Sequence, residues 1–224
     1  MRRFLRENSL TLFFLAIFLA ALGGQLLVGH ADFNHEQVAH EEETVSLWRY
    51  ATSSAYLVDV MENWQSEYLQ FTLFILATVW LVQKGSTESK PLGQEGGESD
   101  EEQKIGKHAG PDSPAWAKAG GLRTRVYSNS LVLVMTAIWL SSWLAQLVTG
   151  RVLYNAEQFD HQEAALSLWQ YAGSSDFWNR TLQNWQSEFL AVASTVVFSI
   201  WLRQRGSSQS KPVGEPHAST GAEG

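Results

Sequence analysis

Apolar residues gather in four blocks that polar segments separate. The blocks cover residues 10–29, 68–82, 130–150 and 189–202, and none contains Asp, Glu, Lys or Arg. A helix needs about 20 apolar residues to cross the hydrocarbon layer of a membrane, and about 17 is the usual minimum. The first and third blocks reach this length. The pattern therefore predicts two transmembrane helices directly, whereas the second and fourth blocks are short.

The two short blocks gain length from the amphipathic segments that precede them. Apolar side chains recur at helical spacing over residues 57–68 and again over residues 178–189. Ser54 and Ser175 are suitable N-cap residues ahead of these runs. We therefore expect each short block to end a longer helix that begins outside the membrane as an amphipathic segment and then enters it.

Tryptophan spacing supports this expectation. Trp64 and Trp80 are 16 residues apart, as are Trp185 and Trp201. This separation corresponds to about 24 Å at a rise of ~1.5 Å per residue. Because indole rings favour the two membrane interfaces, these pairs predict a slightly thin bilayer crossing.

The chain aligns with itself without a gap when residues 8–93 are placed on residues 129–214. About two in five aligned residues are identical, which is typical of an internal repeat. We expect an all-α membrane protein with four transmembrane helices, formed by tandem duplication of a two-helix hairpin with an extracytoplasmic amphipathic connector. The expected parts are a first hairpin repeat over 1–93 (membrane helices at about 8–29 and 64–83), a disordered cytoplasmic linker over 94–124, a second hairpin repeat over 125–214 (membrane helices at about 129–150 and 185–203) and a disordered tail over 215–224.

Basic residues predict the orientation of the helices. Arg2, Arg3 and Arg6 precede the first block, and Lys or Arg also follow the second, precede the third and follow the fourth, whereas each connector holds one or two arginines. By the positive-inside rule, both termini and the linker are cytoplasmic. A cleaved secretory signal is the alternative for the N-terminal block. The same pattern recurs at Asn129, where no signal peptide can lie, so we expect a retained helix.

Composition excludes several classes of chemistry. The chain has no Cys, so it has no disulfide, thiolate nucleophile or Cys-ligated metal. Its net charge of −7 is opposite to the charge that nucleic-acid binding favours. The Gly-, Pro- and acid-rich stretch from residue 85 to residue 121 is typical of a solvated tether. No GxSxG, phosphate-loop or dinucleotide motif is present, and we expect no cofactor and no enzyme activity.

The motif NWQSE occurs at residues 63–67 and 184–188 and supplies the main candidate site. Its glutamates fall about one helical turn inside the outer tryptophan level. We expect an interfacial polar clamp, in which Glu67 pairs with Gln25 and Glu188 with Gln146. A ligand or proton site is the alternative, because ionisable residues within membranes are functional candidates. The candidate residues are Gln25, Asn63, Glu67, Gln146, Asn184 and Glu188.

Small residues four apart recur at the same offset in the first and third blocks. Such residues let transmembrane helices approach closely. The pattern predicts a packed seam of Ala16, Ala20 and Gly24 against Ala137, Ser141 and Ala145.

The segment HEQVAH at residues 35–40 invites comparison with a zinc-protease motif. That motif needs histidines four apart, whereas these are five apart, and Ala156 stands in the place of His35 in the second copy. We favour a solvated segment. The weak metal candidates that remain are Glu36, His40, Glu157 and His161.

Taken together, the motifs resemble a bacterial family catalogued as domain of unknown function 6766. The resemblance rests on NSL at residue 8, N-x-E-Q at residues 34 and 155, SLW with a following Tyr, NWQSE(F/Y)L, and GSxxSKP at residues 85 and 206. It covers everything but the linker and tail. It implies a bacterial membrane protein of four helices, and it implies no activity.

We favour a non-catalytic structural or interaction role in a bacterial plasma (inner) membrane, with the lipid bilayer as partner and no nucleic acid. A protein partner or homo-oligomer stays open. The alternative is a small solute or ion carrier that uses the paired outer Glu/Gln site. An outward-facing metal-dependent enzyme is the third possibility.

Overall fold

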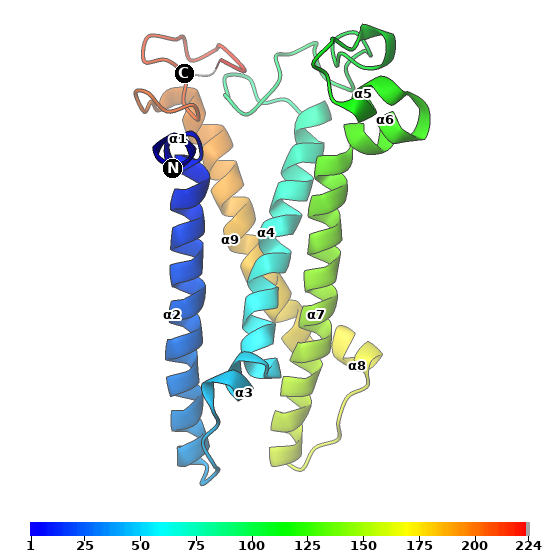
Figure 1. Cartoon of the computed structure of the whole chain (residues 1–224). Coiled ribbons are helices and arrows are strands. Elements are labelled where there is room, and N and C mark those ends of the chain that lie inside the picture. Colours follow the sequence, from blue (N-terminus) through cyan, green and yellow to red (C-terminus); the bar gives the residue numbers. More distant parts are fainter. Residues whose placement is uncertain (223–224) are drawn as a thin grey trace. The chain divides into compact units, whose positions relative to one another are not determined.

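The computed structural model describes residues 1–222, and over this range the chain forms helices and no β-strand (Figure 1). The expectation of an all-α protein is confirmed for these residues. The long helices are α2 (Ser9–Ala39), α4 (Ser54–Trp80), α7 (Ser130–Asp160) and α9 (Ser175–Trp201). The short ones are α1 (Arg2–Glu7), α3 (Leu47–Ala51), η1 (Gly106–His108), α5 (Ala115–Ala119), α6 (Gly121–Ser128) and α8 (Leu168–Ala172).

The chain divides into two compact units. The first unit comprises residues 1–61 and 145–171, and the second unit comprises residues 62–144 and the chain from residue 172 onward. The divisions fall inside α4 and α7 and before the last residue of α8. The first unit therefore contains the connector segments around α3 and α8, and the second contains both copies of NWQSE.

Helix α2 is longer than expected. The apolar block ends at Gly29, but the helix continues for ten more residues through a polar sequence to Ala39. It ends where Glu41 adopts a left-handed backbone, and α7 ends in the same way before Gln162. No Gly or Pro lies between residues 30 and 39 to stop the helix earlier. In the described part of the chain, α2 and α7 are the two helices whose length and composition suit a membrane span.

Helices α4 and α9 are each continuous for 27 residues, through NWQSE to a tryptophan. Their N-caps differ by one residue from those expected at Ser54 and Ser175, which are already helical. Ser174 Oγ accepts the Phe177 N–H at 3.2 Å, and Ser53 Oγ accepts the Tyr56 N–H at 3.3 Å. A serine pair precedes each helix, and the first serine of each pair reaches the amide three residues on, as an N-cap does.

Helix α4 ends at Trp80 and α9 ends at Trp201, slightly before the expected residues 83 and 203. A loop built from GSxxSKP takes over at this point. Ser89 Oγ accepts the Gln83 N–H at 2.8 Å, and Ser210 Oγ accepts the Gln204 N–H at 2.9 Å. The motif therefore forms the same local turn at both places.

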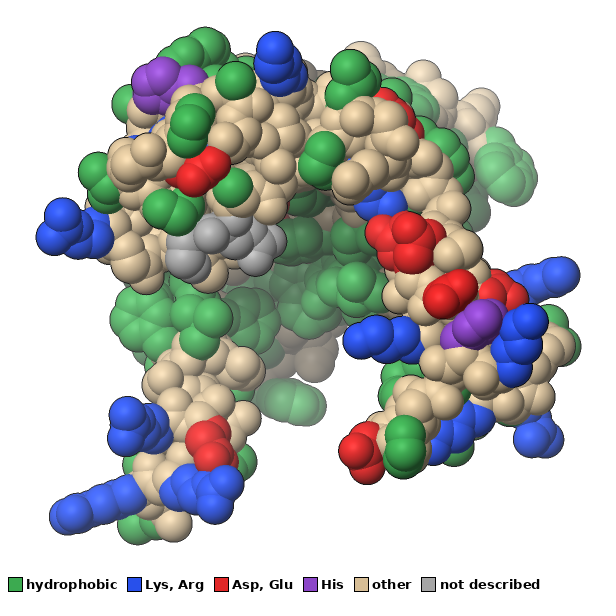
Figure 2. Space-filling view, turned by 90° about the horizontal axis from the view of Figure 1, so that it is seen from above, with side chains coloured by type: hydrophobic (Ala, Val, Ile, Leu, Met, Phe, Trp, Pro, Cys, Tyr) green, Lys and Arg blue, Asp and Glu red, His purple; other side chains and the backbone are tan. Residues whose placement is uncertain are grey.

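The segment that we expect to be a disordered linker contains η1 and α5 and leads into α6. Gly120, with a φ angle of 71°, separates α5 from α6, and Gly121, the first residue of α6, also has a positive φ angle of 60°. Many Lys, Arg, Asp and Glu side chains project from this segment, seen at the right of Figure 2. A solvated surface agrees with its composition, although short helical turns form along it.

The tail also differs from expectation, because residues 215–222 pack on the first GSxxSKP loop. Lys211 is 1% exposed, and its ammonium donates to the carbonyls of Gly85 at 2.6 Å and His217 at 2.9 Å. Gly221 N–H donates to Ser86 O at 3.0 Å. Burial lowers the pKa of Lys211, and the carbonyl bonds compensate for lost hydration. These backbone and ammonium bonds order a segment whose composition alone predicts disorder.

Candidate functional site

The two copies of NWQSE lie on α4 and α9, and polar side chains of the two motifs meet across these helices. Trp185 Nε1 donates to Gln65 Oε1 at 2.9 Å, and Ser66 Oγ lies 3.5 Å from Glu188 Oε1. Gln65 is 0% exposed and Ser66 is 1% exposed. We call these four residues the α4–α9 polar seam. In Figure 1, α4 and α9 cross one another.

A charged group continues the seam toward the beginnings of the two helices. Arg180 Nη1 lies 3.4 Å from Glu62 Oε2, and Arg180 Nε lies 3.5 Å from Asp176 Oδ2. Glu62 is buried, with 9% of its surface exposed. A buried carboxylate needs a partner because it has lost most of its hydration. Arg180 supplies that partner and joins α9 to α4.

The remaining residues of the motif are arranged asymmetrically. The carboxyl groups of Glu67 and Glu188 are close enough to influence one another electrostatically. Glu67 is exposed on α4, and Glu188 is half-buried on α9. Asn184 Nδ2 donates to the Arg180 carbonyl at 2.9 Å, so it bonds within its own helix. Asn63 is exposed.

The expected clamp joins residues of different units. Gln25 and Gln146 belong to the first unit, whereas Glu67 and Glu188 belong to the second. Gln25 is exposed along α2, and Gln146 is 0% exposed on α7. The pairing of each glutamate with a glutamine therefore stays a prediction.

The small-residue seam also stays a prediction, since α2 lies in the first unit and the segment of α7 before Ala145 lies in the second. Along these helices, five of the six small side chains are exposed and the sixth is half-buried. The exposed residues are Ala16, Ala20, Gly24, Ala137 and Ser141, and the half-buried one is Ala145.

Each connector is tied to the helix before it by an asparagine, a feature that sequence reasoning missed. Asn34 Oδ1 accepts the Val45 N–H at 2.8 Å, and Asn34 Nδ2 donates to the Val45 carbonyl at 3.1 Å. Asn155 makes the same two bonds to Leu166, at 2.8 Å and 3.0 Å. One amide side chain thus satisfies both backbone groups of the facing residue, as a strand neighbour does. The identity of both asparagines in the self-alignment was the available signal.

A tyrosine–glycine contact also attaches each connector to the long helix that precedes it. Tyr50 is 5% exposed and Tyr171 is 0% exposed, and each hydroxyl lies over a glycine of the preceding helix. A Cβ added at Gly150 would lie 2.5 Å from Tyr171 Oη, and one at Gly29 would overlap Tyr50 in the same way. Burial, followed by the Asp59 carboxylate, raises the pKa of Tyr50, so the phenol stays neutral near pH 7. Only glycine lets the ring approach this closely.

The weak metal candidates lie at the ends of α2 and α7. Within residues 1–222, no group of three His, Asp or Glu side chains is placed to hold a metal ion. The four candidates are exposed, and they are Glu36, His40, Glu157 and His161.

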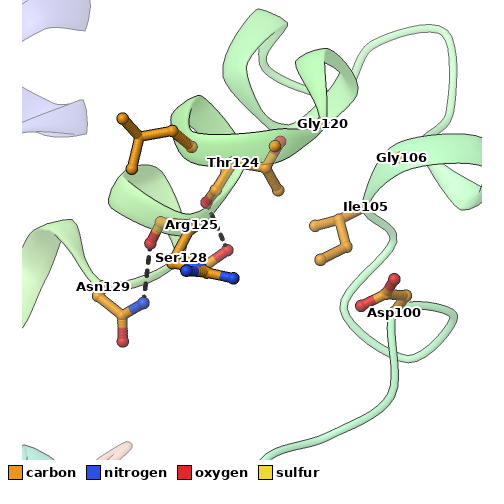
Figure 3. Close-up of a pocket in the computed structure, with 10 residues that line it drawn as sticks. Asp100, Ile105, Gly106, Gly120, Thr124, Arg125, Ser128 and Asn129 are labelled. Atoms are coloured by element: carbon orange, nitrogen blue, oxygen red, sulfur yellow. Dashed lines mark hydrogen bonds between the residues drawn. The ribbon is translucent and has the colours of Figure 1, made fainter.

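A cleft of about 540 Å³ lies between the linker and the α6–α7 junction (Figure 3). Its lining residues include Asp100, Ile105 and Arg125. Ser128 Oγ donates to the Thr124 carbonyl at 2.8 Å, and Asn129 Nδ2 donates to the Arg125 carbonyl at 2.8 Å. These polar groups bond to the adjacent backbone, so the cleft does not present a convergent set of catalytic groups.

The comparisons with known proteins agree with the motifs. A family model described as a domain of unknown function (DUF6766) matches residues 1–222. The match covers the linker as well as both copies of the connector, NWQSE and GSxxSKP motifs. No curated protein and no solved structure matches the chain. The resemblance expected from the sequence is confirmed, and the chain belongs to the DUF6766 family.

Proposed function

We propose that this chain is a four-helix integral protein of a bacterial plasma membrane that acts through structure or interaction rather than catalysis. In this arrangement α2, α4, α7 and α9 cross the bilayer, and both termini and the linker face the cytoplasm. The connectors around α3 and α8 face the other side. Two copies of one hairpin make up the membrane part.

The apolar surface of α2 carries this proposal. No residue of this fully described, 31-residue helix is buried, and Leu10, Phe13 and Phe14 are 72%, 60% and 60% exposed. Contact of apolar surface with water costs about 25 cal/mol per Å². A helix that is apolar on every side needs a nonaqueous surrounding, and the bilayer supplies it for the whole uncharged block.

The matched contacts of the two connectors support the duplicated hairpin. Asparagine, glycine and tyrosine occupy equivalent positions in both copies and make the same contacts there. The two GSxxSKP loops also share a hydrogen bond. A common origin accounts for the recurrence of these contacts at one sequence offset.

Membrane integration is tested by alkaline carbonate extraction of cell membranes that contain the full chain. An integral protein stays in the pellet after carbonate and moves to the supernatant with detergent. Release by carbonate alone contradicts the proposal. A peripheral protein of known behaviour, extracted in parallel, verifies that the treatment is effective.

The carrier alternative draws on one observation, the proximity of the Glu67 and Glu188 carboxylates beside the α4–α9 polar seam. It predicts that proteoliposomes take up protons or a small cation and that Glu67→Gln with Glu188→Gln abolishes the uptake. The non-catalytic structural role predicts no flux in either protein. Glu157→Gln, an exposed position at the end of α7, is the matched control.

A further inference from the structure

The short helices α3 and α8 each carry a tryptophan whose side chain is largely exposed. Trp48 is 78% exposed and Trp169 is 81% exposed. On the same helices, Tyr50 and Tyr171 are buried against the preceding long helix. Each short helix therefore has one fixed aromatic residue and, two positions earlier, one aromatic residue that contacts little of the protein.

The tyrosine contacts fix the depth of these short helices. Tyr50 lies on Gly29, the last residue of the uncharged block that begins at Leu10. This block of 20 residues is about 30 Å long at ~1.5 Å per residue, which matches the thickness of the hydrocarbon layer. Figure 1 shows α3 beside the C-terminal half of α2.

The polar end of α2 extends beyond this level. Asn34, one to two turns past Gly29, bonds to Val45 as the chain returns toward α3. The acidic stretch Glu41–Glu43 lies in the turn at the far end. The chain thus leaves the apolar level, reverses, and comes back to it at α3. The second connector repeats this path through Asn155–Leu166 and Gly150–Tyr171.

We propose that α3 and α8 lie in the outer headgroup layer of the bilayer, where Trp48 and Trp169 anchor the two connectors to lipid. The proposal rests on the proposed membrane function. Indole rings favour this layer because their apolar body meets acyl chains while the N–H meets water and headgroups. Exposed Leu27 and Val28 on α2 continue the apolar surface up to the same level.

Lipid suits this surface better than a protein partner does. The exposed apolar surface of each short helix itself is small, because it consists of one tryptophan, with Leu47 (39% exposed) beside it on α3, and the flanking Arg49 and Gln170 are also exposed. A stable protein interface needs about 800 Å² from each partner, whereas one indole contributes at most about 250 Å². One indole at the depth of the headgroups, next to the apolar surface of the preceding helix, is enough for an interfacial anchor.

The depth of each short helix is measurable because the chain has no Cys. Single variants Trp48→Cys and Trp169→Cys are spin-labelled in phosphatidylcholine–phosphatidylglycerol proteoliposomes. Collisions with oxygen and with a water-soluble nickel chelate then report the depth of the label. Leu19→Cys, 55% exposed in the middle of the apolar block, gives the hydrocarbon reference. Glu43→Cys gives the aqueous reference. A second pair of variants, Arg49→Cys and Gln170→Cys, keeps both tryptophans.

We expect all four labels on α3 and α8 to give oxygen-to-nickel accessibility ratios between those of the two references. The inference is overturned if they match Glu43→Cys while Leu19→Cys reports hydrocarbon, and in that case membrane integration stands. Labels shielded from both reagents also overturn it, because a protein then covers the tryptophans. If Leu19→Cys itself is aqueous, the proposed membrane function fails, and the lipid anchor fails with it.

Discussion

A few glycine and asparagine residues determine how each connector packs against the helix that precedes it. Gly29 and Gly150 end the apolar blocks, and their missing side chains make room for the rings of Tyr50 and Tyr171. Asn34 and its counterpart in the second copy then bond both backbone groups of the returning chain. Together these contacts fix the distance and the register of the connector.

Gly150→Ala should destabilise the protein. The added methyl group must displace the buried ring of Tyr171, and overpacking of this kind costs about 1–3 kcal/mol. The helix propensity of Ala offsets up to about 1 kcal/mol of that cost. We expect a net loss of up to about 2 kcal/mol in the free energy of unfolding, measured by SDS titration in mixed micelles.

Gly23→Ala is the matched control, because no described atom outside its own helix lies within 4 Å of an added Cβ. It should leave stability unchanged or raise it slightly. Tyr171→Phe in the Gly150→Ala background should restore part of the loss, since the nearest remaining ring atom would be Cζ, at 3.2 Å. Equal stability of Gly150→Ala and Gly23→Ala would show that the tyrosine contact is not tight.

Helices α4 and α9 meet through residues of NWQSE, the motif that the sequence highlighted, but the sequence did not predict these contacts between the two copies. Periodicity was enough to predict that each helix runs through NWQSE, since apolar residues recur every three or four positions. It was not enough to identify partners, because successive helical residues point about 100° apart. Gln65 and Ser66 face α9, and the neighbouring Glu67 is exposed. Which face meets which helix depends on packing between segments more than 100 residues apart.

Helix boundaries show the same limit at a finer scale. The serine pairs at 53–54 and 174–175 predicted helix starts, but either serine of a pair can cap, and backbone geometry selects the first. The ten polar residues that extend α2 past Gly29 belong to no apolar block. Hydropathy identifies a membrane-spanning segment, but it does not predict how far the helix continues into the aqueous phase beyond that segment.

Trp185→Phe should weaken the α4–α9 polar seam. The change removes the indole donor and leaves the Gln65 carbonyl oxygen, in a residue that is 0% exposed, without this bond. An unsatisfied buried acceptor costs about 1–3 kcal/mol. A double-mutant cycle with Gln65→Leu isolates the pair. Interhelical polar pairs in membranes couple by about 0.6 kcal/mol on average, with about 1.7 as a maximum.

The second copy of the motif provides the control for this cycle. Gln186 occupies the position of Gln65 in NWQSE but is exposed. Gln186→Leu should therefore change stability little and should show no coupling to Trp185→Phe. If the two glutamines couple equally to Trp185, the asymmetric pairing of α4 and α9 is incorrect.

At the scale of the whole molecule, the account requires that all four long helices cross the membrane. Length and composition identify α2 and α7 among the described helices. The last charged residues of α4 and α9 are Glu67 and Glu188, at the middle of each helix, and the uncharged stretch that follows covers 13 residues in each helix. Their crossing is therefore the decisive claim, because it determines on which side of the membrane the linker lies.

Reporter fusions test that claim most directly. Paired cytoplasmic and periplasmic reporters are placed at Glu42, after Gly93, at Glu163 and at the C-terminus. Four crossings with a cytoplasmic N-terminus predict periplasmic signals at Glu42 and Glu163 and cytoplasmic signals after Gly93 and at the C-terminus. If only α2 and α7 cross, the Gly93 fusion becomes periplasmic and the Glu163 fusion becomes cytoplasmic. That result, or a cytoplasmic signal at Glu42, would contradict the four-helix account.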